Sequence, residues 1–275
     1  MSRNLGASTI SGVFGDSKRA NRAAFIAYLM AGDPMPTATP ELIRAAINGG
    51  ADIIELGFPY SDPLADGPSI QAAAARALRS GTTFDTVLDI AGTLPVPAPA
   101  PLIGFSYFNP IYVRGVERTA QDLRQAGFAG AIIPDLPPEE GAEAAATFAN
   151  YGLALPFFVA PTTVAKRLPL IAAMSTGFIY VVSRMGVTGA VTVIDAEAEA
   201  LIHRLRAQTD RALAVGFGIS TPEQARRVAT FADGVIVGSG LVDIIASSPP
   251  DLAPEAVRSY CAQLAAACRR GARDA

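Results

Sequence analysis

The sequence is poor in the residues that build disulfide frameworks, histidine triads and metal centres. It has two cysteines and one histidine in 275 residues. Cys261 and Cys268 lie in a helical pattern at a spacing of about 10 Å along the axis, which is too far for a disulfide. His203 lies in a charged helical segment, where a solvated side chain is expected. We therefore expect no metal site and no histidine-based catalysis.

Long apolar runs and basic clusters are also missing. No segment approaches the roughly 18 apolar residues that span a bilayer, and residues 1–14 lack the apolar core of a signal peptide. The chain has 22 lysine and arginine residues against 25 aspartate and glutamate residues, so it offers no positive field for nucleic acid. We expect a cytoplasmic protein that acts on a small molecule.

Half of the residues are hydrophobic, so the chain can bury the core of one barrel-sized domain or of two small domains. No linker-like segment favours a division into two domains. After a short helix expected within residues 1–22, strand and helix patterns alternate. The expected strands are 25–31, 51–57, 102–107, 130–133, 153–159, 178–182, 212–215 and 234–237. The expected helices are 40–48, 70–79, 84–93, 115–126, 138–150, 164–173, 195–207, 222–231 and one or more from 241 onward.

These strands show no polar alternation, which indicates that both of their faces are buried, as in parallel sheets covered by helices. Eight such units in 275 residues favour an α/β fold, a closed (β/α)8 TIM barrel that forms a single domain over residues 1–275. A doubly wound open sheet fits the same periodicity. The proline-rich stretch 95–101 is interpreted as a connector, because the alternation resumes directly after it.

Glu55 stands out because it interrupts the apolar run 51–57. A buried carboxylate is costly unless it is paired, hydrogen-bonded or protonated, so Glu55 is either an ion-pair member or a working acid or base. Asp62 and Asp66 follow in a proline-rich loop, and the prolines make this loop rigid, so that its side chains keep fixed positions. Aspartate before proline or glycine also structures turns. Their closeness to Glu55 favours a functional role for at least one of them.

Glycines gather where three of the later strands are expected to end. The segments 216–220 and 238–240 each lead into a helix, and 183–190 follows the sixth strand. Loops after the strands build the sites of barrels, and glycines at a helix N-terminus let backbone N–H groups approach an anion. One glycine alone is more often part of a turn. Together, the three segments predict a phosphate cradle.

The segment from Glu55 to Pro68 reads Glu-Leu-Gly-Phe-Pro-Tyr-Ser-Asp-Pro-Leu-Ala-Asp-Gly-Pro. These fourteen residues resemble the signature of the tryptophan synthase alpha chain family, and the similarity runs from Gly32 to Ser239. The resemblance implies a carbon–carbon lyase of tryptophan biosynthesis. Such an enzyme cleaves indole-3-glycerol phosphate into indole and glyceraldehyde 3-phosphate. The resemblance also makes Glu55 and Asp66 the catalytic residues.

The resemblance implies further roles. Tyr180 would bind substrate near the catalytic glutamate, although it also fits core packing, and Asp135 would support the loop of Asp62 and Asp66. Thr188, in the loop after the sixth strand, is expected to contact the substrate. The residues that would hold the phosphate are Gly189, Gly218, Gly238 and Ser239. Apolar residues at strand exits would suit a flat aromatic ring, though each is also a plausible core residue: Phe105, Ile132 and Phe217.

In this family a beta chain carries pyridoxal phosphate and takes up the indole, so the resemblance implies an alpha2beta2 tetramer and no cofactor in this chain. Candidate contacts are Asp62, Pro63 and the loop 107–110. Met30 and Val191 depart from the threonine and the polar residue that are usual in the family. Three alternatives stay open: an indole-releasing lyase without a partner, another barrel isomerase of phosphorylated sugars, and a non-catalytic activating subunit.

Overall fold

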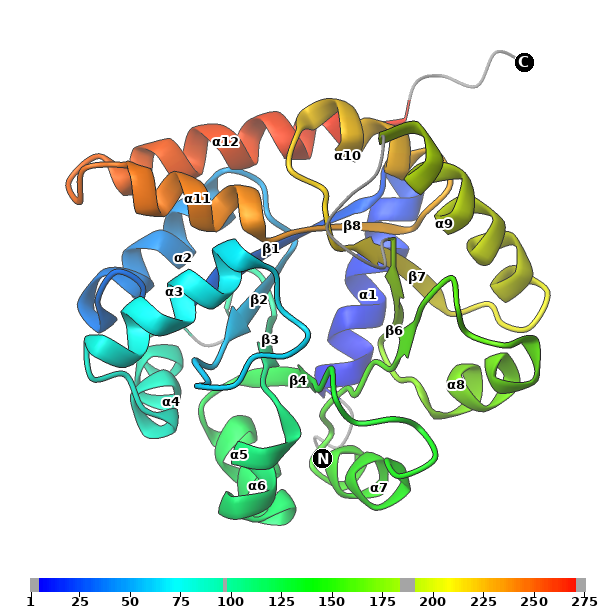
Figure 1. Cartoon of the computed structure of the whole chain (residues 1–275), viewed down its shortest axis with the longest axis horizontal. Coiled ribbons are helices and arrows are strands. Elements are labelled where there is room, and N and C mark those ends of the chain that lie inside the picture. Colours follow the sequence, from blue (N-terminus) through cyan, green and yellow to red (C-terminus); the bar gives the residue numbers. More distant parts are fainter. Residues whose placement is uncertain (1–4, 96–97, 184–190, 271–275) are drawn as a thin grey trace.

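The structure is a computed structural model that describes residues 5–95, 98–183 and 191–270. Its eight strands pair in parallel and form one sheet, in the order β4-β3-β2-β1-β8-β7-β6-β5. Figure 1 shows this sheet curled around the centre of the molecule with helices outside it. The strands are β1 (Ala24–Met30), β2 (Ile53–Gly57), β3 (Leu102–Phe105), β4 (Phe128–Ile132), β5 (Phe158–Val159), β6 (Phe178–Val182), β7 (Ala212–Gly216) and β8 (Gly234–Val237).

The segment that precedes the edge strand β5 bonds to the other edge strand, β4, through a parallel bridge between Gly130 and Ala154. The N–H of Ala154 donates to the carbonyl of Ala129, and the N–H of Ala131 donates to the carbonyl of Ala154, each at 2.9 Å. Strand order also follows chain order without the reversal that a doubly wound sheet requires. The expected (β/α)8 barrel is therefore confirmed, and the open-sheet alternative is wrong.

The helices follow the strands around the outside of the barrel. Capping boxes begin two of them, with Thr83 and Thr86 at the start of α4 and Thr221 and Gln224 at the start of α10. In the part of the chain that the structure describes, no helix is long and apolar enough to cross a membrane. The α-helices are α1 (Leu5–Arg19), α2 (Thr39–Asn48), α3 (Pro68–Arg79), α4 (Phe84–Gly92), α5 (Phe108–Arg114), α6 (Val116–Gln125), α7 (Ala142–Asn150), α8 (Leu168–Met174), α9 (Val191–Arg206), α10 (Pro222–Ala229), α11 (Ser239–Ser247) and α12 (Ala253–Ala267).

Among the elements that differ from the expectation are β5 and α5. The strand expected over 153–159 forms a ladder only at Phe158–Val159. In the residues that precede this ladder, two backbone N–H groups donate to side-chain hydroxyls and not to a neighbouring strand. The N–H of Leu155 donates to Thr176 at 2.7 Å, and that of Phe157 donates to Ser175 at 3.2 Å. The helix α5 was not expected, because its Asn109-Pro110 pair is typical of a loop. Proline is nevertheless compatible with the first turn of a helix.

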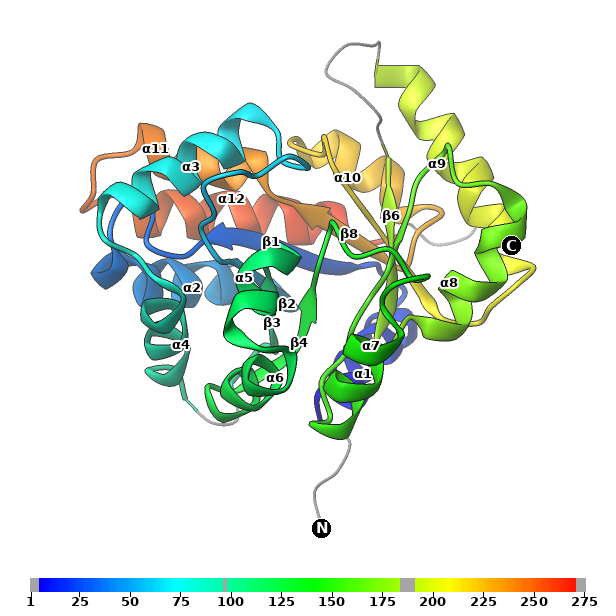
Figure 2. The same ribbon diagram turned by 60° about the horizontal axis from the view of Figure 1, so that its bottom comes forward.

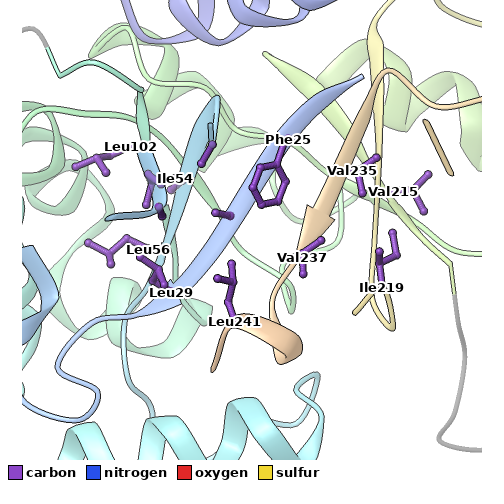
Figure 3. Close-up of a cluster of buried hydrophobic side chains, with 14 of the residues drawn as sticks. Phe25, Leu29, Ile54, Leu56, Leu102, Val215, Ile219, Val235, Val237 and Leu241 are labelled. Carbon is purple, nitrogen blue, oxygen red and sulfur yellow. The ribbon is translucent and has the colours of Figure 1, made fainter. Parts of the chain in front are cut away.

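Alternate residues of each strand face the barrel interior and the surrounding helices. Both faces are buried, as predicted. On β1, Ile26, Tyr28 and Met30 belong to the interior cluster, whereas Phe25 and Leu29 belong to the outer one. Figure 3 shows the outer cluster, in which side chains from the sheet and from α11 lie together: Phe25, Leu29, Ile54, Leu56, Leu102, Val215, Val235, Val237 and Leu241.

Helix α1 packs across the end of the barrel where the strands begin (Figure 2). It has 15 residues and is longer than the short helix expected there. Its Ile10 and Phe14 are buried in the interior cluster, and the ring of Phe14 lies 5.5 Å from that of Phe178. The interior of the barrel is therefore filled by apolar side chains at this end, which we call the foot. Within the interior, a polar site can form only at the opposite end.

Candidate active site

Glu55 lies in the middle of β2 on the face that points into the barrel. In the parallel register it pairs with Tyr28 on β1 and with Ile103 on β3. The residue is 1% exposed, and its Oε2 has no hydrogen-bond partner in the structure. Burial and the nearby carboxylate of Asp66 raise the pKa of Glu55 to about 8. Because no cation pairs with it in the described chain, the ion-pair interpretation of Glu55 fails, and the raised pKa favours the neutral form of its carboxyl group near pH 7.

Asp66 lies in the loop between β2 and α3, and backbone hydrogen bonds hold this loop. The N–H of Asp66 donates to the carbonyl of Pro63 at 3.1 Å, and Gln71 donates to the carbonyl of Asp66 at 2.8 Å. The N–H of Ala65 donates to the hydroxyl of Tyr107 at 2.9 Å. Tyr107 follows β3, so the loops after two neighbouring strands fix the position of Asp66.

Asp66 is half-buried and close to Glu55. Burial raises the pKa of Asp66 to about 6, against a hydrogen bond from Tyr107 that lowers it. Burial also raises the pKa values of the hydroxyls of Tyr28 and Tyr180, and the nearby charges of Glu55 and Asp66 raise them further. The two carboxylates and these tyrosines therefore share one region at the carboxyl end of the barrel interior.

Tyrosines and phenylalanines form the walls of this region. Tyr180 on β6 is buried and stacks on Phe158 at 4.5 Å between ring centroids, with Phe217 edge-on at 5.7 Å. Across the interior, Tyr28 meets Phe105 edge-on at 5.8 Å. All of these rings belong to the interior cluster, so the structure brings the expected Tyr180, Phe105 and Phe217 together.

Ile132 also belongs to this cluster, where it pairs with Phe105 in the register between β3 and β4. Met30, one of the family departures, lies in the same interior cluster at the end of β1. The sequence reasoning missed Tyr28, Tyr107 and Phe158. The signal for Tyr28 was present, because it occupies an inward position two residues before Met30 on a strand that was correctly predicted.

The hydroxyl of Tyr28 has no hydrogen-bond partner within the described residues, although it is buried. It lies against Gly57, where a Cβ would come within 2.3 Å of the hydroxyl oxygen. Gly216 bears the same relation to Tyr180, with a Cβ position 2.5 Å from that hydroxyl. The two glycines therefore leave room for tyrosine hydroxyls that reach across the interior to a neighbouring strand.

The exits of β6, β7 and β8 meet on the same rim. The hydroxyl of Ser183, after β6, donates to the carbonyl of Gly216 at 2.8 Å and also to that of Phe217. A Cβ at Gly240 in α11 would lie 3.4 Å from the Cα of Ser220. The glycine segments after β7 and β8 are therefore neighbours, as the expected phosphate cradle requires.

Gly218 is exposed and has a φ of +85°, which glycine adopts without strain, and Gly238 is the N-cap of α11. Ser239 is the first residue of that helix, where backbone N–H groups have no partner within the helix. These three expected phosphate residues therefore share one rim with Tyr180. The fourth expected phosphate residue, Gly189, and the expected substrate contact Thr188 lie outside the described residues.

Asp62 is exposed and makes a hydrogen bond with its neighbour Ser61. Asp135 accepts the N–H of Phe108 at 2.8 Å, at the start of α5. Its support of the Asp66 loop is therefore indirect, through the adjacent Tyr107. In the chain as far as the structure describes it, no group of three or more histidine, cysteine, aspartate or glutamate residues is placed to hold a metal ion.

Comparison with known proteins identifies the family. A family model described as tryptophan synthase alpha chain matches residues 14–270. The tryptophan synthase alpha chains of Gloeobacter violaceus and Solibacter usitatus are 48% and 45% identical to this chain, over 93% and 90% of its length and 93% and 92% of theirs. A structure of Mycobacterium tuberculosis tryptophan synthase superposes with a TM-score of 0.87 at 37% identity, covering 95% of this chain and 98% of that one. The chain belongs to the tryptophan synthase alpha chain family.

Proposed function

We propose that this chain cleaves indole-3-glycerol phosphate into indole and glyceraldehyde 3-phosphate by a retro-aldol reaction. The observation that carries the proposal is Glu55, a buried carboxyl group whose Oε2 has no partner among the described residues and whose pKa is raised to about 8. A neutral carboxylic acid with a free oxygen in an aromatic pocket is suited to moving protons on a bound ring.

Glu55 delivers one proton and receives one. In its neutral form it protonates C3 of the indole ring, which places positive charge on the ring nitrogen. The resulting carboxylate removes the proton of the hydroxyl on the adjacent side-chain carbon. That carbon becomes the aldehyde, its bond to C3 breaks, and the bonding electrons restore the aromatic ring. Glu55 ends the cycle protonated, as it began.

Asp66 acts as the anion that stabilises the ring cation. With a pKa raised to about 6 it is mostly ionised at neutral pH, and it lies close enough to Glu55 to raise the pKa of that group. Its carboxylate accepts the indole N–H, and this hydrogen bond strengthens as the ring gains positive charge. Tyr107 and the backbone of the loop hold it in place.

The substrate spans the carboxyl end of the barrel. Its ring lies between Tyr28, Phe105 and Tyr180, and its phosphate lies on the rim formed after β7 and β8. There the N-terminus of α11 adds a favourable dipole. The proposed phosphate groups are the backbone N–H groups of Gly189, Gly218, Gly238 and Ser239, and the further substrate contacts are Ile132, Phe217 and Thr188.

The family name supports a beta-chain partner, and we propose an alpha2beta2 tetramer in the cytoplasm in which the beta chain carries pyridoxal phosphate. The reaction in this chain needs only acid, base and anion-binding groups. The proposed contact surface is formed by the loop of Asp62 and Pro63 together with residues 107–110. Asn109 donates to the hydroxyl of Tyr60 at 3.4 Å, which ties the two loops together, and Leu64 is 94% exposed beside them.

Indole release from indole-3-glycerol phosphate by the purified chain tests this function. Glu55→Gln and Asp66→Asn should each reduce turnover by about a thousandfold or more without unfolding the protein. Glu41→Gln, which changes an exposed carboxylate on α2 in the same way, should leave the rate unchanged. Near-normal rates in either site variant would refute the assigned roles, and no indole from the wild type, alone or with a beta chain, would refute the function.

A second assay separates the remaining alternatives. A lyase that works without a partner turns over equally fast with and without a beta chain, whereas a tetramer subunit is accelerated by it. A phosphate-sugar isomerase would release no indole under either condition. A non-catalytic subunit would raise the reaction rate of its partner, and its Glu55→Gln variant would raise that rate by the same factor as the wild type.

A further inference from the structure

A hollow of about 1100 Å³ lies at the foot of the barrel, away from Glu55. Its walls come from the end of α1, from the segments that precede β7 and β8, and from the residues that follow α12. These segments meet because the N–H of Ala23 donates to the carbonyl of Cys268 at 2.9 Å. Figure 1 shows α10 and α12 side by side next to this corner. We call it the foot hollow.

The foot hollow is strongly cationic. Five of its lining residues are basic, namely Lys18, Arg206, Arg226, Arg269 and Arg270, and only Asp210 and Asp233 oppose them. The local net charge is therefore +3 in a chain whose total formal charge is -3. Charge of one sign in a concave surface concentrates the electric field and attracts ions of opposite charge.

Two of these guanidinium groups are fixed by the backbone. Arg270 donates to the carbonyls of Ala229 and Ala232 at 2.7 and 2.6 Å, at the end of α10. Arg206 donates to the carbonyl of Arg211 at 2.8 Å and pairs with Asp233. Bonds to carbonyl groups hold the arginine side chain in place but leave its formal charge uncancelled. Arg270 is therefore a pre-positioned cation.

The other basic groups keep their charge available. Within the described residues, the side chains of Lys18 and Arg269 make no hydrogen bond or ion pair, and Arg226 interacts only weakly with Glu223 on its own helix. Phe231 also lines the hollow with a half-buried ring. The guanidinium of Arg227 lies over this ring, 5.7 Å from its centroid. A ligand in the hollow would therefore meet uncompensated positive charge beside an aromatic ring.

We propose that the foot hollow binds a polyphosphate group, either inorganic or as the phosphate chain of a nucleotide. The basic side chains come from four segments of the chain, at α1, α9, α10 and the end of α12, so an anion with several linked phosphates can meet more of them at once than a single phosphate can. This site is separate from the proposed active site, because it lies where β1, β7 and β8 begin and Gly238 lies where β8 ends.

Isothermal titration calorimetry of the full chain with inorganic triphosphate tests the proposal. The double variant Arg226→Glu/Arg269→Glu should weaken binding at least tenfold. The control Arg44→Glu/Arg79→Glu makes the same change in net charge at exposed positions on α2 and α3, and should change the affinity less than threefold. Equal weakening in both double variants, or no binding to the wild type, would overturn the proposal.

Two further arms complete the experiment. Excess glycerol 3-phosphate occupies the glycine rim, so it should leave triphosphate binding unchanged, and displacement by it would overturn the proposal. ATP should bind at least as tightly as inorganic triphosphate; a gain of tenfold assigns the site to nucleotides, and equal affinity assigns it to polyphosphate itself. Weaker binding of ATP than of inorganic triphosphate would show that the nucleoside of ATP does not fit beside Phe231. If the double variant fails to fold, Arg226→Gln should still weaken triphosphate binding by threefold or more.

Discussion

Replacing Tyr28 by phenylalanine removes a single oxygen atom, which is buried and has no partner within the described residues. A buried polar group without a hydrogen bond costs about 1–3 kcal/mol. We therefore expect Tyr28→Phe to raise the free energy of unfolding by about 1 kcal/mol or more. In a chain of this size that corresponds to an increase of about 2 °C in melting temperature, which calorimetry can resolve.

The same change should lower activity. Tyr28 pairs with Glu55 in the strand register, and the substrate ring is proposed to lie beside it. If a substrate hydroxyl supplies the missing partner, the variant loses one hydrogen bond in the transition state, worth about 1.4 kcal/mol. This corresponds to about a tenfold fall in kcat/KM for indole release. The expected result is a protein that is more stable and less active.

Thr119 provides the matched control. Among the described residues its hydroxyl on α6 is also buried without a partner, but it lies outside the barrel interior. Thr119→Val should therefore bring a comparable gain in stability with no change in kcat/KM. Full activity in Tyr28→Phe would refute a role for the hydroxyl in substrate binding. A loss of stability in that variant would refute the structural premise, because it would mean that the hydroxyl has a partner.

Other predictions follow from the charges of the site. The rate profile kcat/KM against pH should be bell-shaped, falling below about pH 6 as Asp66 is protonated and above about pH 8 as Glu55 loses the proton it must donate; a flat profile from pH 5 to 9 would contradict these roles. Because the folded pKa of Glu55 lies above its unfolded value, its burial costs nothing below about pH 4 and destabilises the fold increasingly up to about pH 8. Glu55→Gln should therefore increase the free energy of unfolding more at pH 8 than at pH 5, and the two increases should differ by on the order of 3 kcal/mol. The melting temperature should rise accordingly, and an equal rise at both pH values would contradict this prediction. Arg76 makes two hydrogen bonds to the buried Asp33, at 2.7 and 2.8 Å. Arg76→Ala should cost about 3 kcal/mol in urea unfolding and Arg79→Ala, on the same helix, less than about 0.5; similar losses would show that the pair is not responsible.

Several features of the fold could be predicted because they are local. The strands around Phe25, Ile54 and Val235 are apolar on both faces, which suffices to indicate a parallel sheet covered by helices. The motif that contains Glu55 and Asp66 and the glycines before α11 carry their chemistry in consecutive residues. The helix α5 and the shortened β5 were not predictable in this way. Gly115, with a φ of +94°, separates α5 from α6, and the hydroxyls of Ser175 and Thr176 replace ladder bonds from outside the strand.

The sequence by itself determined the strand and helix alternation and the glycine-rich exits, because each depends on neighbours along the chain. For the acidic pair, the residues alone singled out Glu55, and the family resemblance favoured Asp66 over Asp62. Only the tertiary structure decided which residues meet. The register between β1 and β2 sets Tyr28 beside Glu55, and the packing of the loops after β2 and β3 places Tyr107 against the Asp66 loop. Closure of the barrel also brings Lys18 and Arg269 to one hollow. These contacts depend on hydrogen bonds and packing between segments far apart in the chain, which no local pattern encodes.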